Sequence, residues 1–223
     1  GYYTIMNTTV GHIKRARTPA QKSDRKDTIL LTAKDQFIET GYEGFSMAVL
    51  AQRAGVAKGT LYLYFRTKEE VLLSLYNSEF DRLCATLVNQ VTPGFTDREF
   101  IDAIYRASIT DPVFLALHAR LNTVIEHNIS IDALIASKRR MLEQFDILIV
   151  AIAEHLNLSH TQTMEAFTAF SALLTGCFDG YAPDLLEREA IPEDLAHFIG
   201  LFNMERRFKQ NAYHILQGIR SVV

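Results

Sequence analysis

Apolar residues recur every three to four positions along most of this chain, in stretches that are separated by its few Pro and Gly residues. This spacing is typical of helices that bury one face against a core. The sequence therefore predicts an all-α protein of about nine helices. The expected helices cover roughly residues 24–40, 46–54, 57–64, 67–92, 97–109, 111–128, 131–157, 160–179 and 192–219.

Short local signals support several of these boundaries. Capping boxes, in which a Thr or Ser precedes a Glu or Gln by three residues, open the helices expected after Thr67, Thr96 and Ser159. Gly41 is expected to stop the first helix, because Gly adopts the left-handed conformation that ends many helices. Pro192 stands in the favoured first turn of the last expected helix.

Charge is distributed unevenly along the chain. The formal net charge is −3, but the first 68 residues contain 11 Lys and Arg against 5 Asp and Glu, and the remainder contains 12 against 21. A basic segment joined to an acidic one indicates a nucleic-acid-binding module followed by a domain with another task. We expect a basic arm at 1–23, a DNA-binding domain at 24–70 with a linking helix from 67, and a second helical domain at 71–223.

Several function classes find no support. The chain has no Gly-x-Ser-x-Gly, His-Glu-x-x-His or phosphate-binding loop, and its seven His residues show no pairing at four-residue spacing. We therefore expect neither an enzyme nor a metal or other cofactor. The longest apolar run, 147–153, is too short to cross a membrane. Cys84 and Cys177 lie far apart in apolar stretches and are interpreted as reduced core residues of a cytoplasmic protein.

Residues 46–65 fit a helix-turn-helix, in which two short helices are joined by a tight turn that contains Gly. The small side chains of Ala51 and Ala54 allow the two helices to cross closely. Gly55 supplies the left-handed conformation that the turn needs, and Val56 fills the angle between the helices.

The helix that follows this turn has an outward face suited to a major groove. Gly59 keeps its first turn slim, and Lys58 is able to donate hydrogen bonds to guanine O6 or N7. The hydroxyls of Thr60, Tyr62 and Tyr64 are able to donate to phosphate oxygens.

Lys68 stands at the start of the next helix, where backbone amides and a cation jointly hold a phosphate. Each of these residues also has a plainer interpretation. Tyr62 and Tyr64 are candidates for packing residues with a hydrated hydroxyl, Lys58 for a solvated lysine, and Lys68 for support of the helix start.

Together these motifs resemble the DNA-binding domain of tetracycline-repressor (TetR) family regulators. The resemblance covers about residues 24–75 and rests on the order and spacing of Gly41-Tyr42, Ser46-Met47, Leu50-Ala51, the run Ala54-Gly55-Val56-Ala57-Lys58-Gly59-Thr60-Leu61-Tyr62-Leu63-Tyr64-Phe65, and Lys68-Glu69-Glu70. It implies an all-α homodimer with an N-terminal helix-turn-helix. It also implies a variable C-terminal domain that binds a small-molecule effector and dimerises through its last two long helices.

Carried over position by position, the resemblance places Lys58 and Gly59 near bases. It assigns phosphate contacts to a set that carries hydroxyl or ammonium groups: Ser46, whose first role is a helix cap, Thr60, Tyr62, Tyr64 and Lys68. The implied function is repression at a palindromic or near-palindromic operator, modulated by the effector. The alternatives are a helical dimeric adaptor and a DNA-binding regulator without an effector.

The basic stretch 12–26 contains six Lys and Arg against one Asp. It is either an arm that reaches DNA or a solvated tail that adds non-specific attraction. Helices 160–179 and 192–219 have enough apolar surface for a four-helix interface between two subunits. The alternative is that they serve only the core of one chain.

If the family layout holds, helix 111–128 lines the effector cavity. Phe114 belongs to its apolar stripe, and His118, Asn122 and Glu126 recur at four-residue spacing on another face. A mainly apolar lining with a few polar groups is what a small-molecule site requires, whereas the alternative is a solvated polar face. Candidate walls elsewhere, each equally a candidate for core packing, are Tyr105, Phe167, Phe170, Cys177, Phe178 and Tyr181.

Overall fold

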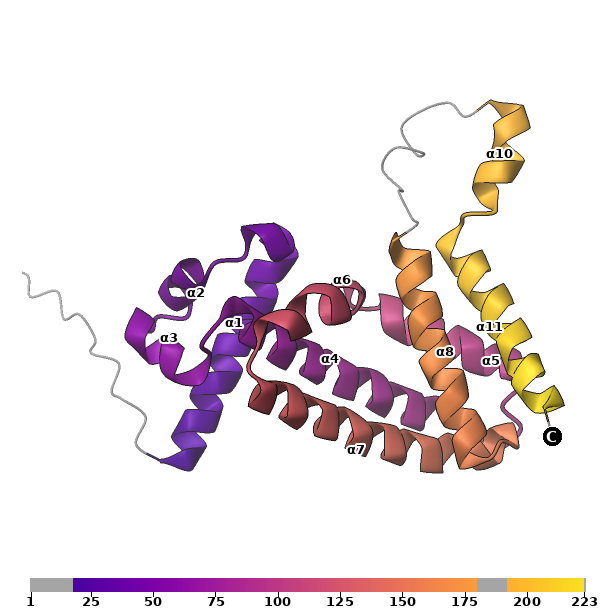
Figure 1. The fold of residues 1–223 in the computed structure, drawn as a ribbon, viewed down its shortest axis with the longest axis horizontal. Helices are drawn as coiled ribbons and strands as arrows, with labels where there is room; N and C mark the ends of the chain where they lie inside the picture. The colour runs from indigo at the N-terminus through magenta and orange to yellow at the C-terminus, as the bar shows by residue number, and fades with distance from the viewer. Residues whose placement is uncertain (1–17, 180–191, 223) are drawn as a thin grey trace, which may run out of the picture. The chain divides into compact units, whose positions relative to one another are not determined.

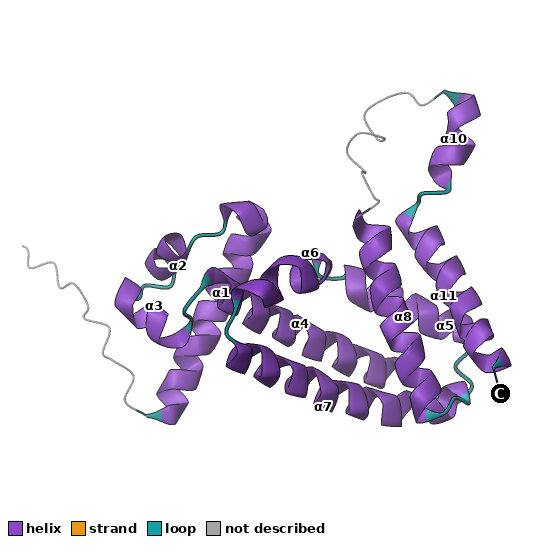
Figure 2. Cartoon of the chain, in the orientation of Figure 1, coloured by secondary structure: helices purple, strands orange, loops and turns teal. Residues whose placement is uncertain are grey.

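The structure is a computed structural model that describes residues 18–179 and 192–222. Within these ranges the chain forms ten α-helices and no β-strand, with a short π-helix and a 3₁₀-helix between α6 and α7 (Figures 1 and 2). The predicted all-α fold is confirmed. The chain divides into two compact units, residues 1–68 and 69–223, and each is described by itself.

Unit 1 contains α1 (Pro19–Gly44), α2 (Met47–Arg53) and α3 (Lys58–Tyr64), and it ends at the first residue of α4 (Lys68–Gln90). Its core draws on each of the three helices and on the segment after α3. Among the most buried side chains are Ile29, Ala33, Leu50, Leu61 and Phe65.

Helix α1 begins earlier than expected. The Thr18 hydroxyl accepts from the Gln21 amide at 3.2 Å, and the Gln21 side chain accepts from the Thr18 amide at 3.3 Å. This capping box, together with Pro19 in the first helical position, starts the helix before residue 24. Residues 19–23, expected in the basic arm, are therefore helical, and residues 1–17 lie outside the described part of the chain. Gly41 has a φ of +64° and interrupts α1 where the sequence predicts its end.

The turn between α2 and α3 has the predicted left-handed glycine. Gly55 has a φ of +64°, and the amide of Val56 donates to the carbonyl of Ala51 at 3.0 Å. The amide of Ala54 donates to the carbonyl of Leu50 at 2.9 Å. These bonds satisfy backbone groups at the end of α2 and fix the direction in which the chain enters α3.

Unit 2 is built around α8. Helix α8 packs against α6, α7 and α11, and α11 also packs against α5 (Figure 1). The elements after α4 are α5 (Asp97–Ile109), α6 (Pro112–Arg120), the π-helix Leu121–Ile125, the 3₁₀-helix Glu126–Asn128, α7 (Ile131–Leu156), α8 (His160–Asp179), α10 (Glu193–Gly200) and α11 (Met204–Ser221). The capping boxes predicted at Thr96 and Ser159 are both present.

Two expected helices are wrong in detail. The helix expected at 192–219 is divided into α10 and α11, because Asn203 starts a new helix by accepting from the Arg206 amide at 2.9 Å. The helix expected at 111–128 is α-helical only as far as Arg120 and continues as π-helix and 3₁₀-helix. This change alters which side chains share a face.

Cys84 and Cys177 are free and buried, as predicted. No helix in the described ranges is long and apolar enough to span a membrane.

We expect Gly55→Ala to lower the free energy of unfolding of unit 1 by about 1–2 kcal/mol, because a Cβ is unfavourable at a positive φ. Gly59→Ala is the matched control, because a Cβ on Gly59 would meet no atom within 4 Å and Gly59 is helical. That variant should keep or raise stability. Urea denaturation followed by circular dichroism measures the free energy of unfolding of both variants. An equal loss of stability in the two variants would contradict the left-handed turn assigned to Gly55.

Candidate nucleic-acid interface and ligand cavity

Helix α3 buries one side and leaves the other open. Leu61 has no exposed surface, and Phe65 directly after the helix is 2% exposed. Lys58 and Gly59 are exposed, Tyr62 is 42% exposed, and the space above the Gly59 backbone is free of other atoms. The first turn of α3 can therefore approach another macromolecule closely.

Thr60 and Tyr64 of the predicted DNA-binding set are half-buried. Tyr62 lies on the exposed side of α3 with Lys58, but Leu63 is more exposed still, at 72%. The open surface of α3 thus combines an ammonium, a phenol and an apolar side chain.

Lys68 is bound within unit 1. Its Nζ donates to the carbonyl of Tyr42 at 3.3 Å and lies 4.0 Å from the centre of the Tyr42 ring. These contacts tie the start of α4 to the end of α1. A phosphate contact by Lys68 stays a prediction.

Ser46 occupies the residue before α2, but its side chain makes no capping hydrogen bond to the helix. The expected side-chain cap is therefore wrong. Instead, the Ser46 carbonyl accepts from Nε2 of the buried Gln36 at 3.2 Å, which fixes the start of α2 against α1. The Ser46 hydroxyl therefore makes no hydrogen bond to the backbone of α2.

A cavity of about 250 Å³ lies within unit 2. Residues from α4, α5, α6, α7 and α8 line it, together with the start of the π-helix. Its walls are largely aromatic, with Tyr76, Phe80, Phe114, Phe145, Phe167 and Phe170 among them. A mainly apolar lining that gathers several helices is the usual form of a small-molecule site.

Half of the predicted effector residues line this cavity: Phe114, His118, Asn122, Phe167 and Phe170. The other described candidates do not. Tyr105 stacks on Phe208 with ring centres 5.8 Å apart, Cys177 is buried elsewhere in the core, and Phe178 is half-buried outside the lining. Tyr181 lies outside the described residues.

Glu126 also lies outside the cavity lining. Its spacing from His118 and Asn122 places all three on one face only in a regular α-helix. The π-helix Leu121–Ile125 adds residues to the turn and rotates Glu126 away. Glu126 instead pairs with Lys138, which does line the cavity.

Several lining residues were missed from the sequence. Tyr76 and Phe80 come from α4, Lys138 and Phe145 from α7, and Ser171 from α8. Periodicity places the aromatic residues on buried faces but gives no information about which buried faces leave a space between them.

A short row of hydrogen bonds crosses the cavity wall at His118. Nε2 of His118 lies 3.2 Å from the carbonyl oxygen of Ser171, and Nδ1 lies 3.0 Å from the Tyr76 hydroxyl. The Ser171 hydroxyl lies 3.1 Å from the same Nε2. A hydrogen bond to the Ser171 carbonyl, which only accepts, requires the proton on Nε2, and Nδ1 then accepts from the Tyr76 hydroxyl. The row is thus satisfied with a neutral imidazole and a neutral phenol.

Burial keeps the cavity interior uncharged. Desolvation lowers the pKa of His118 and raises the pKa of Tyr76, so both stay neutral near pH 7. Burial, aided by the nearby Asp81 carboxylate, raises the pKa of the Cys84 thiol to about 12. The exposed side chains of Asn122, Lys138 and Thr168 mark the mouth of the cavity.

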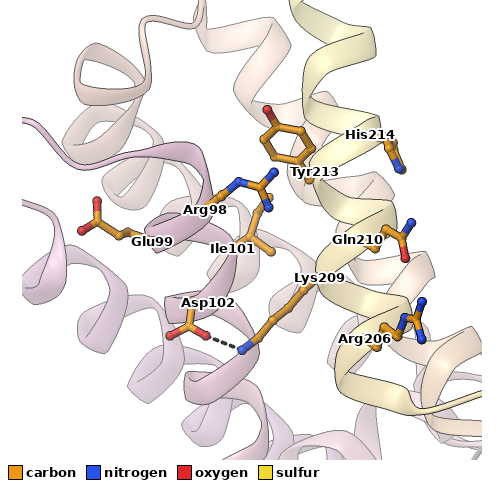
Figure 3. Close-up of a pocket in the computed structure, with 9 residues that line it drawn as sticks. All are labelled: Arg98, Glu99, Ile101, Asp102, Arg206, Lys209, Gln210, Tyr213 and His214. Carbon is orange, nitrogen blue, oxygen red and sulfur yellow. Dashed lines mark hydrogen bonds and ion pairs between the residues drawn. The ribbon is translucent and has the colours of Figure 1, made fainter. Parts of the chain in front are cut away.

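A larger depression of about 720 Å³ lies between α5 and α11 (Figure 3). Most of its side chains are charged or polar, and Lys209 forms an ion pair with Asp102 across it. The Arg98 guanidinium lies 4.3 Å from the centre of the Tyr213 ring. Buried aromatic side chains wall the smaller cavity, so the smaller cavity is the better candidate ligand site. No group of three or more potential metal ligands occurs among the described residues.

Comparison with known proteins agrees with this geometry. Residues 29–75 match the model of bacterial regulatory proteins of the tetR family, and residues 74–222 match the tetracyclin repressor-like C-terminal domain. The "Fatty acid metabolism regulator protein" of Bacillus subtilis is 32% identical over 79 residues, which are 35% of this chain and 41% of that protein. The "HTH-type transcriptional repressor KstR" of Rhodococcus jostii is 37% identical over 102 residues, which are 42% of this chain and 45% of that protein.

The matched stretches therefore span less than half the length of these two relatives. Among solved structures, a possible TetR family transcriptional regulator from Streptomyces coelicolor has a TM-score of 0.59 at 20% identity, covering 89% of this chain and all of that one. At this identity the likeness shows the fold. Both matched models describe regulatory proteins, so the expectation of a non-enzymatic regulator is confirmed.

We expect the titration of His118 to reduce stability in acid. Its pKa is lowered from 6.5 in the folded state, so below that value the unfolded chain binds a proton that the folded chain does not. The free energy of unfolding then falls as the pH falls, by up to about 1.4 kcal/mol per unit until the folded pKa is reached.

His118→Gln removes this titration but keeps a polar side chain. Urea denaturation at about pH 7.5 and about pH 5 should show a smaller loss of stability for the variant than for the wild type. Identical losses in the two proteins would show that His118 is not the buried neutral group described above.

Proposed function

Because the chain belongs to the tetR family of bacterial regulatory proteins, we propose that it represses transcription by binding a palindromic operator as a homodimer, and that a small molecule in the unit 2 cavity weakens this binding. The observation that carries the proposal is the 250 Å³ cavity. Its walls are apolar, and the polar groups of Tyr76, His118 and Ser171 hydrogen-bond to one another. These features favour a ligand site in the domain that is not expected to contact DNA.

The proposed DNA contact is the open side of α3. Lys58 and Gly59 stand in its first turn, where the slim backbone lets the Lys58 ammonium reach base edges. The hydroxyls of Thr60, Tyr62 and Tyr64 would donate hydrogen bonds to phosphates. The Ser46 hydroxyl, which makes no capping hydrogen bond to α2, is available for the same purpose. The positive charge of the first 68 residues adds sequence-independent attraction.

The proposed dimer interface consists of the outward faces of α8 and α11. These two helices pack on each other, and Ala172 and Gly176 of α8 and Gly218 of α11 are exposed. Such small side chains permit a second pair of helices to approach closely. Two-fold symmetry would then place two α3 helices on half-sites about one helical turn, roughly 34 Å, apart.

Helix α4 is the proposed link between ligand and DNA. Tyr76, Phe80 and Leu83 of α4 line the cavity, while Lys68 at its start is bound to Tyr42 of unit 1. A ligand weakens DNA binding only if it binds more tightly to the dimer whose α3 helices are misplaced. The relative KstR is described as a transcriptional repressor, which supports repression as the outcome.

We expect Lys58→Ala to raise the dissociation constant for a duplex selected from random DNA by about 10- to 100-fold and to relax its sequence preference. Fluorescence anisotropy of labelled duplexes measures this effect. The control is Lys68→Ala, which should weaken binding to selected and random duplexes alike. If Lys58→Ala bound the selected duplex like the wild type, the contact assigned to α3 would be wrong.

Effector control is tested by filling the cavity. Leu174 lines it and is 5% exposed, so Leu174→Phe adds volume where a ligand would lie. A panel of small organic acids, alcohols, phenols and amines should contain compounds that weaken duplex binding by the wild type. The variant should bind the duplex but no longer respond to them. A wild type that no compound affects would contradict effector control and favour a constitutive regulator.

A further inference from the structure

An ion pair stands at the mouth of the cavity. Lys138 of α7 lines the cavity, and its Nζ lies 2.5 Å from Oε1 of Glu126 in the 3₁₀-helix after α6. The Lys138 side chain is 46% exposed, whereas that of Glu126 is only 13% exposed. Lys138 therefore faces a prospective ligand while it neutralises a largely buried carboxylate.

The charges around the cavity discriminate between ligand classes. Among the described lining residues Lys138 is the one with a permanent charge, and no carboxylate lines the cavity. A cationic ligand would find no carboxylate among the lining residues, whereas an anionic group at the mouth would find Lys138. The cavity volume of about 250 Å³ lies below the range of roughly 300–1,000 Å³ that is usual for small-molecule sites. The apolar part of the ligand is therefore small.

We propose that the cavity binds a small monocarboxylic acid with an apolar body, and that the ligand carboxylate replaces Glu126 as the partner of Lys138. This inference rests on the proposed function, in which the cavity is the effector site. It names the chemical class of the effector and the residue that selects it.

The replacement has a structural consequence. Glu126 would be left as a mostly buried carboxylate without its cation, which is strongly unfavourable. The Glu126 carboxylate regains favourable hydration only if its side chain turns towards water. Its segment is suited to such a movement because it is not a regular α-helix. The π-helix Leu121–Ile125 and the 3₁₀-helix Glu126–Asn128 precede α7, and Leu121 and Asn122 of the same segment line the cavity. Ligand binding at Lys138 would thus rearrange residues 121–128.

The test uses three probes that share one apolar body: octanoate, octanol and octylamine. Isothermal titration calorimetry on the full chain should give octanoate an affinity about two- to fivefold above that of octanol, because its carboxylate takes over the ion pair with Lys138 while Glu126 becomes hydrated. Octylamine should bind more weakly than octanol.

Variants of α7 and of the 3₁₀-helix locate this preference. Lys138→Met keeps most of the side-chain stem and removes the charge, so it should bind octanol like the wild type and lose the preference for octanoate. Arg139→Met, at the exposed neighbouring position, should keep the preference. Glu126→Gln should bind octanoate more tightly than the wild type, because Lys138 is no longer held by a carboxylate.

Hydrogen exchange of the amides in 121–128 reports the displacement of Glu126. Exchange should be faster with octanoate than with octanol. The inference is overturned if none of the probes binds, if octanoate and octanol bind equally, if Lys138→Met keeps the preference, or if exchange is the same with both.

Duplex affinity is measured separately on the same samples. If octanoate binds with the expected selectivity but leaves the affinity for DNA unchanged, the proposed effector control fails and the assigned ligand class stands.

Discussion

Helix α8 has apolar side chains around most of its circumference, and unit 2 depends on covering them. Such a helix is unstable in water until other helices bury it on several sides. Helices α6, α7 and α11 provide this cover, and the rings of Phe167 and Phe170 join an aromatic cluster with Phe100 and Phe208. The cover is incomplete where α4, α6 and α7 meet α8, and the cavity occupies that place. One constraint thus accounts for both the core and the cavity.

The two units meet different physical requirements. Unit 1 needs a small, fixed turn, which Gly55 and the bonds at the end of α2 provide, so that α3 presents an open face. Under the proposed function, unit 2 needs an interior that holds a ligand without leaving charges unpaired, and the hydrogen-bonded neutral groups of Tyr76, His118 and Ser171 meet this requirement. Helix α4 contains residues of both units. Any coupling between them is reciprocal, because a ligand that weakens DNA binding must itself be bound less tightly when DNA is present.

The sequence predicts most of the fold because local signals decide it. Periodicity and capping boxes place 97–109 and 160–179 where α5 and α8 lie. The early start of α1 was missed although Thr18-Pro19-Ala20-Gln21 is itself a capping signal. The cavity is only partly predictable, because periodicity along residues 111–128 finds Phe114, His118 and Asn122 but cannot report which residues of α4 and α7 face them. Residues at four-residue spacing share a face only in an unbroken α-helix. The π-helix Leu121–Ile125 interrupts the α-helix, so this spacing gives the wrong position for Glu126.

The most direct test of the account is the sequence that the purified full chain enriches from a pool of random duplexes. Two copies of α3, related by two-fold symmetry, should enrich a palindrome with half-site centres about 10 base pairs, or a multiple of that spacing, apart. Enrichment of no sequence, or of a single half-site without a symmetric partner, would contradict the account.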